Sequence, residues 1–234
     1  FGEGVFPSNQ SLSVSPSSGF DIVIGYDELC DTPTAQQQSA FSSAEAVWES
    51  IITGYVDPVS SHSLAITACL TTIDGPGGTL GSAGPRTRKL PQTQNYLYAA
   101  TGSMTFDVAD VANLISAGAF DDVILHEMAH VIGVGTLWSS SSVGFPGFQE
   151  LYPISGRYTG TAGLSAYQSE FNQPSASFVP VELGGGSGTR NSHWNEVNGG
   201  AGPTGIVSSI SGLDMQYELM TGWLNSPSFI SSLT

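Results

Sequence analysis

The stretch A-F-D-D-V-I-L-H-E-M-A-H-V-I-G, residues 119–133, indicates how the chain folds and where its chemistry lies. Apolar residues recur in it at helical spacing, namely Val123, Ile124, Met128, Val131 and Ile132. Asp121 and Asp122 fall in the first turn, where acidic side chains favour a helix N-terminus. Gly133 stands where a C-terminal cap is expected. The sequence therefore predicts a helix with one apolar face over 119–133.

The polar side of this helix carries the motif H-E-M-A-H at residues 126–130. His126 and His130 are four residues apart, so both imidazoles project from one face and can bind one metal ion. Glu127 lies beside them and can reach a water molecule at the metal without coordinating the metal itself. This pattern indicates a zinc-dependent hydrolase with Glu127 as general base. The alternative is a helix that carries two histidines and binds no metal.

Zinc sites of this kind take three protein ligands and leave the fourth position to water. Two further histidines are present, His62 and His193. His62 stands in S-S-H-S before an expected strand and is interpreted as an exposed loop residue. His193 stands in N-S-H-W-N-E beside a tryptophan that could shield a site, so it is favoured as the third ligand. A glutamate, Glu150 or Glu170, is the main alternative.

Strand and helix patterns alternate upstream of the motif. Strands are expected over 20–26, 63–73 and 103–106, a helix over 35–55, a second helix after Asp107 as its cap, and a hairpin or edge strand within the glycine-rich 75–85. The first helix has an apolar stripe of Phe41, Ala44, Val47, Trp48, Ile51 and Ile52. A periodic pattern of this kind predicts a helix with one apolar face.

After Gly133 the composition changes to loops rich in glycine and serine, with one helix expected over 163–171. We therefore expect an α+β protein with two subdomains. The N-terminal, upper subdomain covers residues 1–133, with a mixed sheet and helices, and ends in the metal-binding helix. The C-terminal, lower subdomain covers residues 134–234 and is irregular and loop-rich.

The charge balance is strongly acidic, with 20 Asp and Glu against 5 Lys and Arg and a formal net charge of -15. Such a chain repels nucleic acid and anionic lipid, so neither is an expected partner. The apolar runs are too short and too interrupted to span a membrane. The charge fits an extracellular protein, although it could equally serve solubility alone. Because the chain starts at Phe1 rather than Met, we interpret it as a mature chain whose leader has been removed.

Acidic clusters also raise the possibility of calcium. The residues in question are Asp21, Asp27, Asp31 and Asp74, but they do not have the spacing of a calcium loop. Calcium is therefore not assigned from the sequence.

The chain has two cysteines, Cys30 and Cys69, which are too few for a disulfide scaffold and lack metal-ligand spacing. In a secreted chain a single bridge between them is expected. Two buried free thiols are the alternative.

Several blocks of the sequence together resemble the leishmanolysin-like metalloproteases, a branch of the metzincins, and especially their short bacterial-type members. These blocks are G-S-M-T-F-D-V-A-D-V-A-N-L at 102–114, V-I-L-H-E-M-A-H-V-I-G-V-G-T-L-W at 123–138, Y-T-G-T at 158–161, V-P-V-E at 179–182, G-S-G-T-R-N-S-H-W-N-E at 186–196 and E-L-M-T-G-W-L at 218–224. The resemblance covers the chain from about residue 102 to the C-terminus, and the order of the blocks makes it specific.

The resemblance implies a metzincin-like zincin and a secreted zinc endopeptidase that cleaves protein or peptide substrates. It implies zinc ligation by His126, His130 and His193 and catalysis by Glu127. It also implies that Met220 forms the tight turn beneath the metal. We expect the protein to act as a monomer.

The sequence departs from the general metzincin pattern in two places. Most metzincins place the third histidine shortly after the first pair, and here that position is Thr136; a long insertion carries the ligand to His193, as in the leishmanolysin branch. The segment 197–216 is longer than the family's usual link, which leaves substrate specificity open.

Glu218, close to Met220, is a candidate for holding a ligand ring, or else a solvated carboxylate. The alternative function is a secreted binding or adhesin module with a vestigial metal site.

Overall fold

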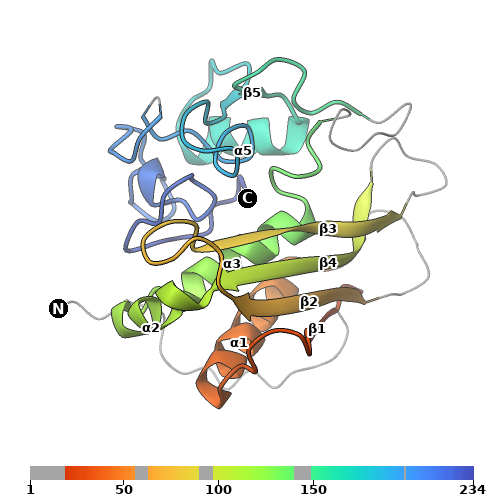
Figure 1. Ribbon diagram of the computed structural model, residues 1–234. Coiled ribbons are helices and arrows are strands. Elements are labelled where there is room, and N and C mark those ends of the chain that lie inside the picture. Colours follow the sequence, from red (N-terminus) through yellow and green to blue (C-terminus); the bar gives the residue numbers. More distant parts are fainter. Residues whose placement is uncertain (1–18, 56–62, 90–96, 140–148, 198) are drawn as a thin grey trace.

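A four-stranded mixed sheet forms the centre of the N-terminal half (Figure 1). The computed structural model describes residues 19–55, 63–89, 97–139, 149–197 and 199–234. The strands are β1 (Ile22–Tyr26), β2 (Leu64–Thr71), β3 (Gly81–Lys89) and β4 (Tyr98–Asp107), in the order β1-β2-β4-β3. β1, β2 and β4 run parallel, and β3 pairs antiparallel with β4 at the edge.

Three helices accompany the sheet: α1 (Ala35–Ile51), α2 (Val108–Ala117) and α3 (Phe120–Ile132). Thr34 begins α1 with a capping box, and the Asp107 side chain caps α2 by accepting from the Ala109 N–H, as the sequence predicted. Gly133 ends α3 with φ of 139°, a value that favours glycine. These local signals set where each helix begins and ends.

The core lies between the sheet and helices α1 and α3. Alternate β2 residues are buried, and three phenylalanine rings, Phe41, Phe106 and Phe120, meet edge to face with centroids 5.4 to 6.1 Å apart. A Cβ placed on Gly102 of β4 would lie 2.2 Å from Val131 Cγ1, so only glycine lets α3 sit this close to the sheet. Close packing therefore fixes α3, and with it the H-E-M-A-H motif.

The described residues of the C-terminal half have little regular structure and lie beyond the β3 edge of the sheet (Figure 1). It contains α5 (Thr161–Glu170), β5 (Arg157–Tyr158), β6 (Val179–Pro180) and the 3-10 turn Met215–Tyr217. Buried carboxylates stabilise its loops. Glu170 accepts from the Ser208 hydroxyl and from the Ser232 N–H and hydroxyl. Hydrogen bonds to acidic side chains therefore add to the apolar packing of this half.

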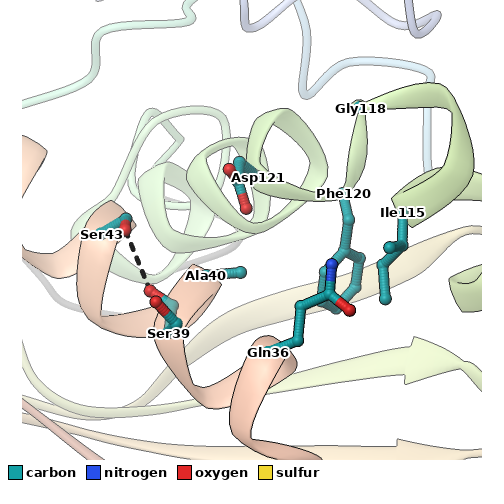
Figure 2. A pocket seen from close by; sticks show the side chains of 8 residues that line it. All are labelled: Gln36, Ser39, Ala40, Ser43, Ile115, Gly118, Phe120 and Asp121. Atoms are coloured by element: carbon teal, nitrogen blue, oxygen red, sulfur yellow. Dashed lines mark hydrogen bonds between the residues drawn. The ribbon is translucent and has the colours of Figure 1, made fainter.

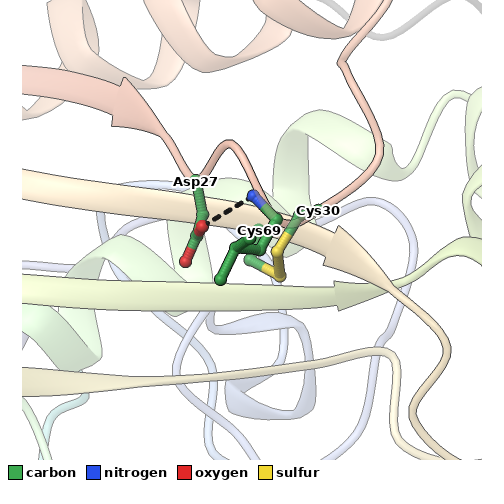
Figure 3. Close-up of a disulfide and its surroundings, with 4 residues drawn as sticks. Asp27, Cys30 and Cys69 are labelled. Atoms are coloured by element: carbon green, nitrogen blue, oxygen red, sulfur yellow. Dashed lines mark hydrogen bonds between the residues drawn. A yellow bond between two sulfur atoms is a disulfide. The ribbon is translucent and has the colours of Figure 1, made fainter.

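The disulfide between Cys30 and Cys69 is present, with a Cα–Cα distance of 5.4 Å. It joins the loop after β1 to β2, beside a turn in which Asp27 accepts from the Leu29 N–H (Figure 3). The bridge closes a loop of 39 residues in sequence separation.

The mixed α+β class is confirmed, and some details differ from expectation. β4 begins at Tyr98 rather than at residue 103, and β3 begins at Gly81, after a loop. The predicted apolar stripe of α1 is wrong at its end, because Ile51 is 49% exposed where the helix stops. Among the described residues, no helix is long and apolar enough to cross a membrane.

Candidate metal centre

Three histidines from two distant parts of the chain meet at one point. His126 and His130 project from α3, and His193 comes from an irregular loop of the C-terminal half. His193 Nε2 lies 2.9 Å from His126 Nε2 and 3.0 Å from His130 Nε2. Among the described residues this is the one group of three or more side chains arranged to hold a metal ion.

The other nitrogen of each ring determines which tautomer is present. Every Nδ1 lies against a backbone carbonyl oxygen: His126 against Leu219 at 2.7 Å, His130 against Val134 at 2.9 Å and His193 against Thr189 at 2.8 Å. A carbonyl oxygen can only accept, so each Nδ1 must donate a proton. In the neutral rings each Nε2 then carries a lone pair and no hydrogen.

Three lone pairs that point at one another repel unless a cation lies between them. Burial, together with the charge of His126, lowers the pKa of His130 to about 3. The pKa of His193 is lowered well below its usual value for the same reasons, and burial lowers that of His126. Near pH 7 the three rings are therefore neutral, which is the protonation state in which imidazole binds a metal ion.

The donor set fits a metal ion. Imidazole nitrogens bind zinc at roughly 2.0–2.1 Å, and the three ligand nitrogens all lie within 4.8 Å of one another, so they can surround one ion and leave a coordination position open. The carbonyl oxygens orient each ring, as outer hydrogen-bond partners commonly do at metal sites. Imidazole also suits copper, nickel and iron. The geometry therefore indicates a metal site without deciding which metal binds.

Glu127 lies one residue from His126 and is only 6% exposed. Its Oε2 is buried without a hydrogen-bond partner, and burial raises the pKa of the carboxyl group to about 8. A Cβ on Gly81, the first residue of β3, would lie 2.8 Å from Glu127 Oε1. Glycine at this position therefore makes room for the carboxylate beside the edge strand.

Met220 is fully buried in a turn that supports the centre. Its carbonyl accepts from the Trp194 N–H at 2.9 Å, and the preceding carbonyl, that of Leu219, holds the His126 ring. Glu218 is buried, not solvated, and accepts from the Met220 N–H rather than from a ligand ring. The expectation that Glu218 might hold a ring is therefore wrong, because backbone carbonyls do so.

The alternative third ligands lie in other hydrogen bonds. Glu170 uses both carboxylate oxygens on serine groups, and Glu150 accepts from the Tyr152 N–H. Thr136, at the usual metzincin ligand position, donates its hydroxyl to the His130 carbonyl. His62 lies outside the described residues. The four aspartates considered for calcium, Asp21, Asp27, Asp31 and Asp74, are exposed and belong to no metal-holding group among the described residues.

Two cavities lie near the helices, and they differ in their relation to the histidines. A cavity of about 410 Å³ lies between α1 and the α2–α3 junction, with Gln36, Ser39 and Asp121 in its lining (Figure 2). No ligand histidine lines it. A smaller cavity of about 260 Å³ borders Val134, Trp138 and Trp194, so it adjoins the loops that carry the metal centre.

Sequence reasoning missed the groups that lie far from the ligands along the chain. It did not foresee the three carbonyl acceptors or the contact of Gly81 with Glu127. It also gave no role to Glu182 and Glu196, which are 0% and 3% exposed. Both glutamates end sequence blocks with apolar residues, V-P-V-E and H-W-N-E, and that composition was an available signal of burial.

No protein-family model matches the chain, and no curated protein matches it in sequence.

Proposed function

We propose that the chain is a zinc-dependent endopeptidase of the leishmanolysin-like, metzincin type. The observation that carries the proposal is the convergence of three deprotonated Nε2 atoms beside a buried carboxylate, Glu127, that has an unpartnered oxygen. Zinc-dependent peptidases use this arrangement, in which two imidazole ligands lie on one helix turn with a glutamate between them in sequence. The resemblance of the sequence blocks supports the same assignment.

Each residue has a definite task in this proposal. His126, His130 and His193 hold the ion, and the carbonyls at their Nδ1 atoms keep the rings in the binding tautomer. Zinc, when bound, lowers the pKa of a water molecule and polarises the scissile carbonyl. Glu127 accepts the proton from that water and passes it to the departing amine. A divalent cation beside Glu127 lowers the pKa of the carboxyl group, which makes it available as a base near pH 7.

The substrate would lie along β3. This strand is at the edge of the sheet, and its first residue contacts Glu127. An edge strand offers backbone groups that can pair with an extended peptide. Pairing there would bring a peptide bond of the substrate to the histidine cluster. An extended protein segment is thus the substrate class that fits best.

In the same proposal, the upper and lower lobes of a metzincin correspond to residues 1–133 and 134–234, with the cleft at α3. Met220 takes the part of the turn beneath the metal. The disulfide and the acidic composition support secretion. We propose a monomer that acts on protein or peptide substrates.

The test combines metal analysis with hydrolysis of a peptide library by the zinc-loaded protein. Glu127→Ala should retain zinc and lose activity by roughly 10²–10⁴-fold, the usual contribution of a general base. Glu170→Gln, a change to a buried glutamate of the same half of the chain as His193, is the matched control and should retain activity. If the wild type cleaves nothing, the chain is a binding module and not a peptidase. If Glu127→Ala cleaves as well as wild type, Glu127 is not the general base and the proposed mechanism is wrong.

A further inference from the structure

Two buried glutamates of the C-terminal half approach the same turn from two sides. Glu182 is fully buried, and its Cγ lies 3.8 Å from the position that a Cβ on Gly222 would take. Glu196 Oε1 accepts a hydrogen bond from Asn225 Nδ2. Both side chains therefore lie close to the segment that follows Met220.

The backbone around the two glutamates is also closely packed. Val181 bridges to Trp194, and Trp194 bridges to Thr221, so three segments lie side by side. A Cβ on Gly184 would lie 2.1 Å from Gly199 Cα, which brings the residues that follow each glutamate into contact. The glutamates thus belong to one small, dense region.

One oxygen of this pair has no partner. Glu182 Oε1 accepts from the Gly184 N–H, whereas Glu182 Oε2 is buried without a hydrogen bond. The other buried glutamates of this half differ: Glu170 and Glu218 have hydrogen bonds to both oxygens. Leaving a buried carboxylate oxygen without a partner is costly, so this oxygen indicates a missing ligand.

The charge of the pair is also uncompensated. Glu196 accepts from the Gly202 N–H and from Asn225 Nδ2, and its pKa is raised mainly by burial and in addition by the charge of Glu182. No basic side chain is among the groups that act on it. Two like charges in a buried region require either a shared proton or a cation.

We propose that Glu182 and Glu196 form a second metal site, which binds calcium and is separate from the histidine cluster. Carboxylate oxygens are hard ligands that suit calcium, whereas the histidine nitrogens suit zinc. Calcium takes six to eight oxygen ligands, so backbone carbonyls and water complete the site. The disulfide agrees with an extracellular setting, and extracellular calcium sites bind in roughly the 10⁻⁴–10⁻³ M range.

The site would stabilise the part of the chain that supplies the third histidine. The Glu182 N–H donates to the His193 carbonyl at 2.9 Å, and the Trp194 N–H donates to the Met220 carbonyl. A cation between the two glutamates would therefore tie together the segments of residues 182, 193–196 and 220–222. Its role is structural, and it takes no part in the reaction.

The experiment is a calcium titration of full-length protein, followed by calorimetry and by thermal unfolding, after both metals have been removed with EGTA, the chelator dialysed away and one equivalent of zinc restored. Wild type should bind one calcium per chain in addition to zinc, and at saturation its unfolding midpoint should rise by roughly 5 °C or more. Magnesium at the same concentration should give a smaller rise, because it demands a tighter octahedral site.

Variants locate the site. Glu182→Gln and Glu196→Gln keep the side-chain shape and should each weaken calcium binding at least about tenfold, because a charged ligand is lost. Without calcium, Glu182→Gln should unfold at the same temperature as wild type or higher, because the repulsion is relieved. Glu170→Gln should keep the full calcium response, which would show that the effect is not common to all buried glutamates. His130→Ala should also keep it, because the histidine cluster is a separate site.

Two results would overturn the proposal. One is a wild-type protein that binds no calcium at concentrations up to about ten times the expected 10⁻³ M limit. The other is calcium binding that both glutamine variants leave unchanged. If a glutamine variant fails to fold, the wild-type titration and the other variant still decide. Zinc content, measured in the same samples, separates this outcome from that of the proposed peptidase.

Discussion

The two halves of the molecule both supply residues to the histidine cluster, but different interactions stabilise them. The described residues of 19–133 form a sheet and helices whose apolar faces pack together, and this half supplies His126, His130 and Glu127. The described residues after 133 are mostly loops, and this half supplies His193. Apolar side chains are buried in both halves, but the loops of the second half depend in addition on several buried glutamates that accept hydrogen bonds. Changes in the two halves should therefore have different signatures.

The largest effect is expected in the packed half. Phe41 is fully buried and contacts the rings of Tyr26, Phe106 and Phe120. Phe41→Ala should lower the free energy of unfolding by about 3–5 kcal/mol, because it removes apolar contacts and leaves a cavity. Urea unfolding of the zinc-loaded protein measures this. A loss below about 1 kcal/mol would mean that packing does not dominate this half.

A smaller and more local effect is expected in the loop half. Glu218 accepts from the Met220 N–H and from the Ser231 N–H and hydroxyl. Glu218→Gln should cost about 1–3 kcal/mol and weaken metal affinity roughly 10-fold or more, because the turn that holds His126 loosens. Competition with a chromophoric chelator measures the affinity. If stability falls while metal affinity is unchanged, Glu218 supports the fold and not the centre.

The pH dependence of the metal-free protein tests the histidines themselves. The folded pKa of His130 is about 3, below its ordinary value of 6.5, so the unfolded chain binds more protons between these values. The stability contributed by the neutral ring is present above pH 6.5 and is lost as pH falls towards 3. The pKa of Glu127 is raised to about 8, so this carboxyl group makes the protein less stable as pH rises, which is opposite to the effect of His130. The total free energy of unfolding therefore does not report on His130 alone.

The useful quantity is the difference between wild type and His130→Ala. As pH falls from 6.5 to 5, the free energy of unfolding of metal-free His130→Ala should rise relative to that of metal-free wild type by about 1.4 kcal/mol per pH unit. Chemical unfolding at three pH values measures the difference. A difference that does not change with pH would mean that the ring is not held neutral by its surroundings.

The same contrast explains what the sequence alone could predict. The spacing of His126, Glu127 and His130 follows from one helix, so a local pattern was sufficient. The disulfide could be predicted because the chain has only two cysteines, and the role of Asp107 as a helix cap could be predicted from the residue preferences at helix N-termini. The start of β4 was missed because the residues that follow Tyr98, A-A-T-G, are small and lack clear alternation.

The rest of the site depends on contacts between residues far apart in the chain. His126 and the carbonyl that orients it are 93 residues apart, and His126 and His193 are 67 residues apart. The choice of His193 over Glu150 or Glu170 could be argued from its neighbours, but nothing local shows where an irregular loop brings it. The burial of Glu182 and Glu196 is likewise invisible in a loop without periodicity.

Three imidazoles, two from the packed half and one from the loop half, are proposed to bind one metal ion. The most direct test is the metal content of purified wild type and His193→Ala, measured by inductively coupled plasma mass spectrometry, with Glu170→Gln as control. We predict one equivalent of zinc in wild type and in the control, and a loss of most of it in His193→Ala. A His193→Ala protein that is folded and still carries one tightly held equivalent would contradict the account.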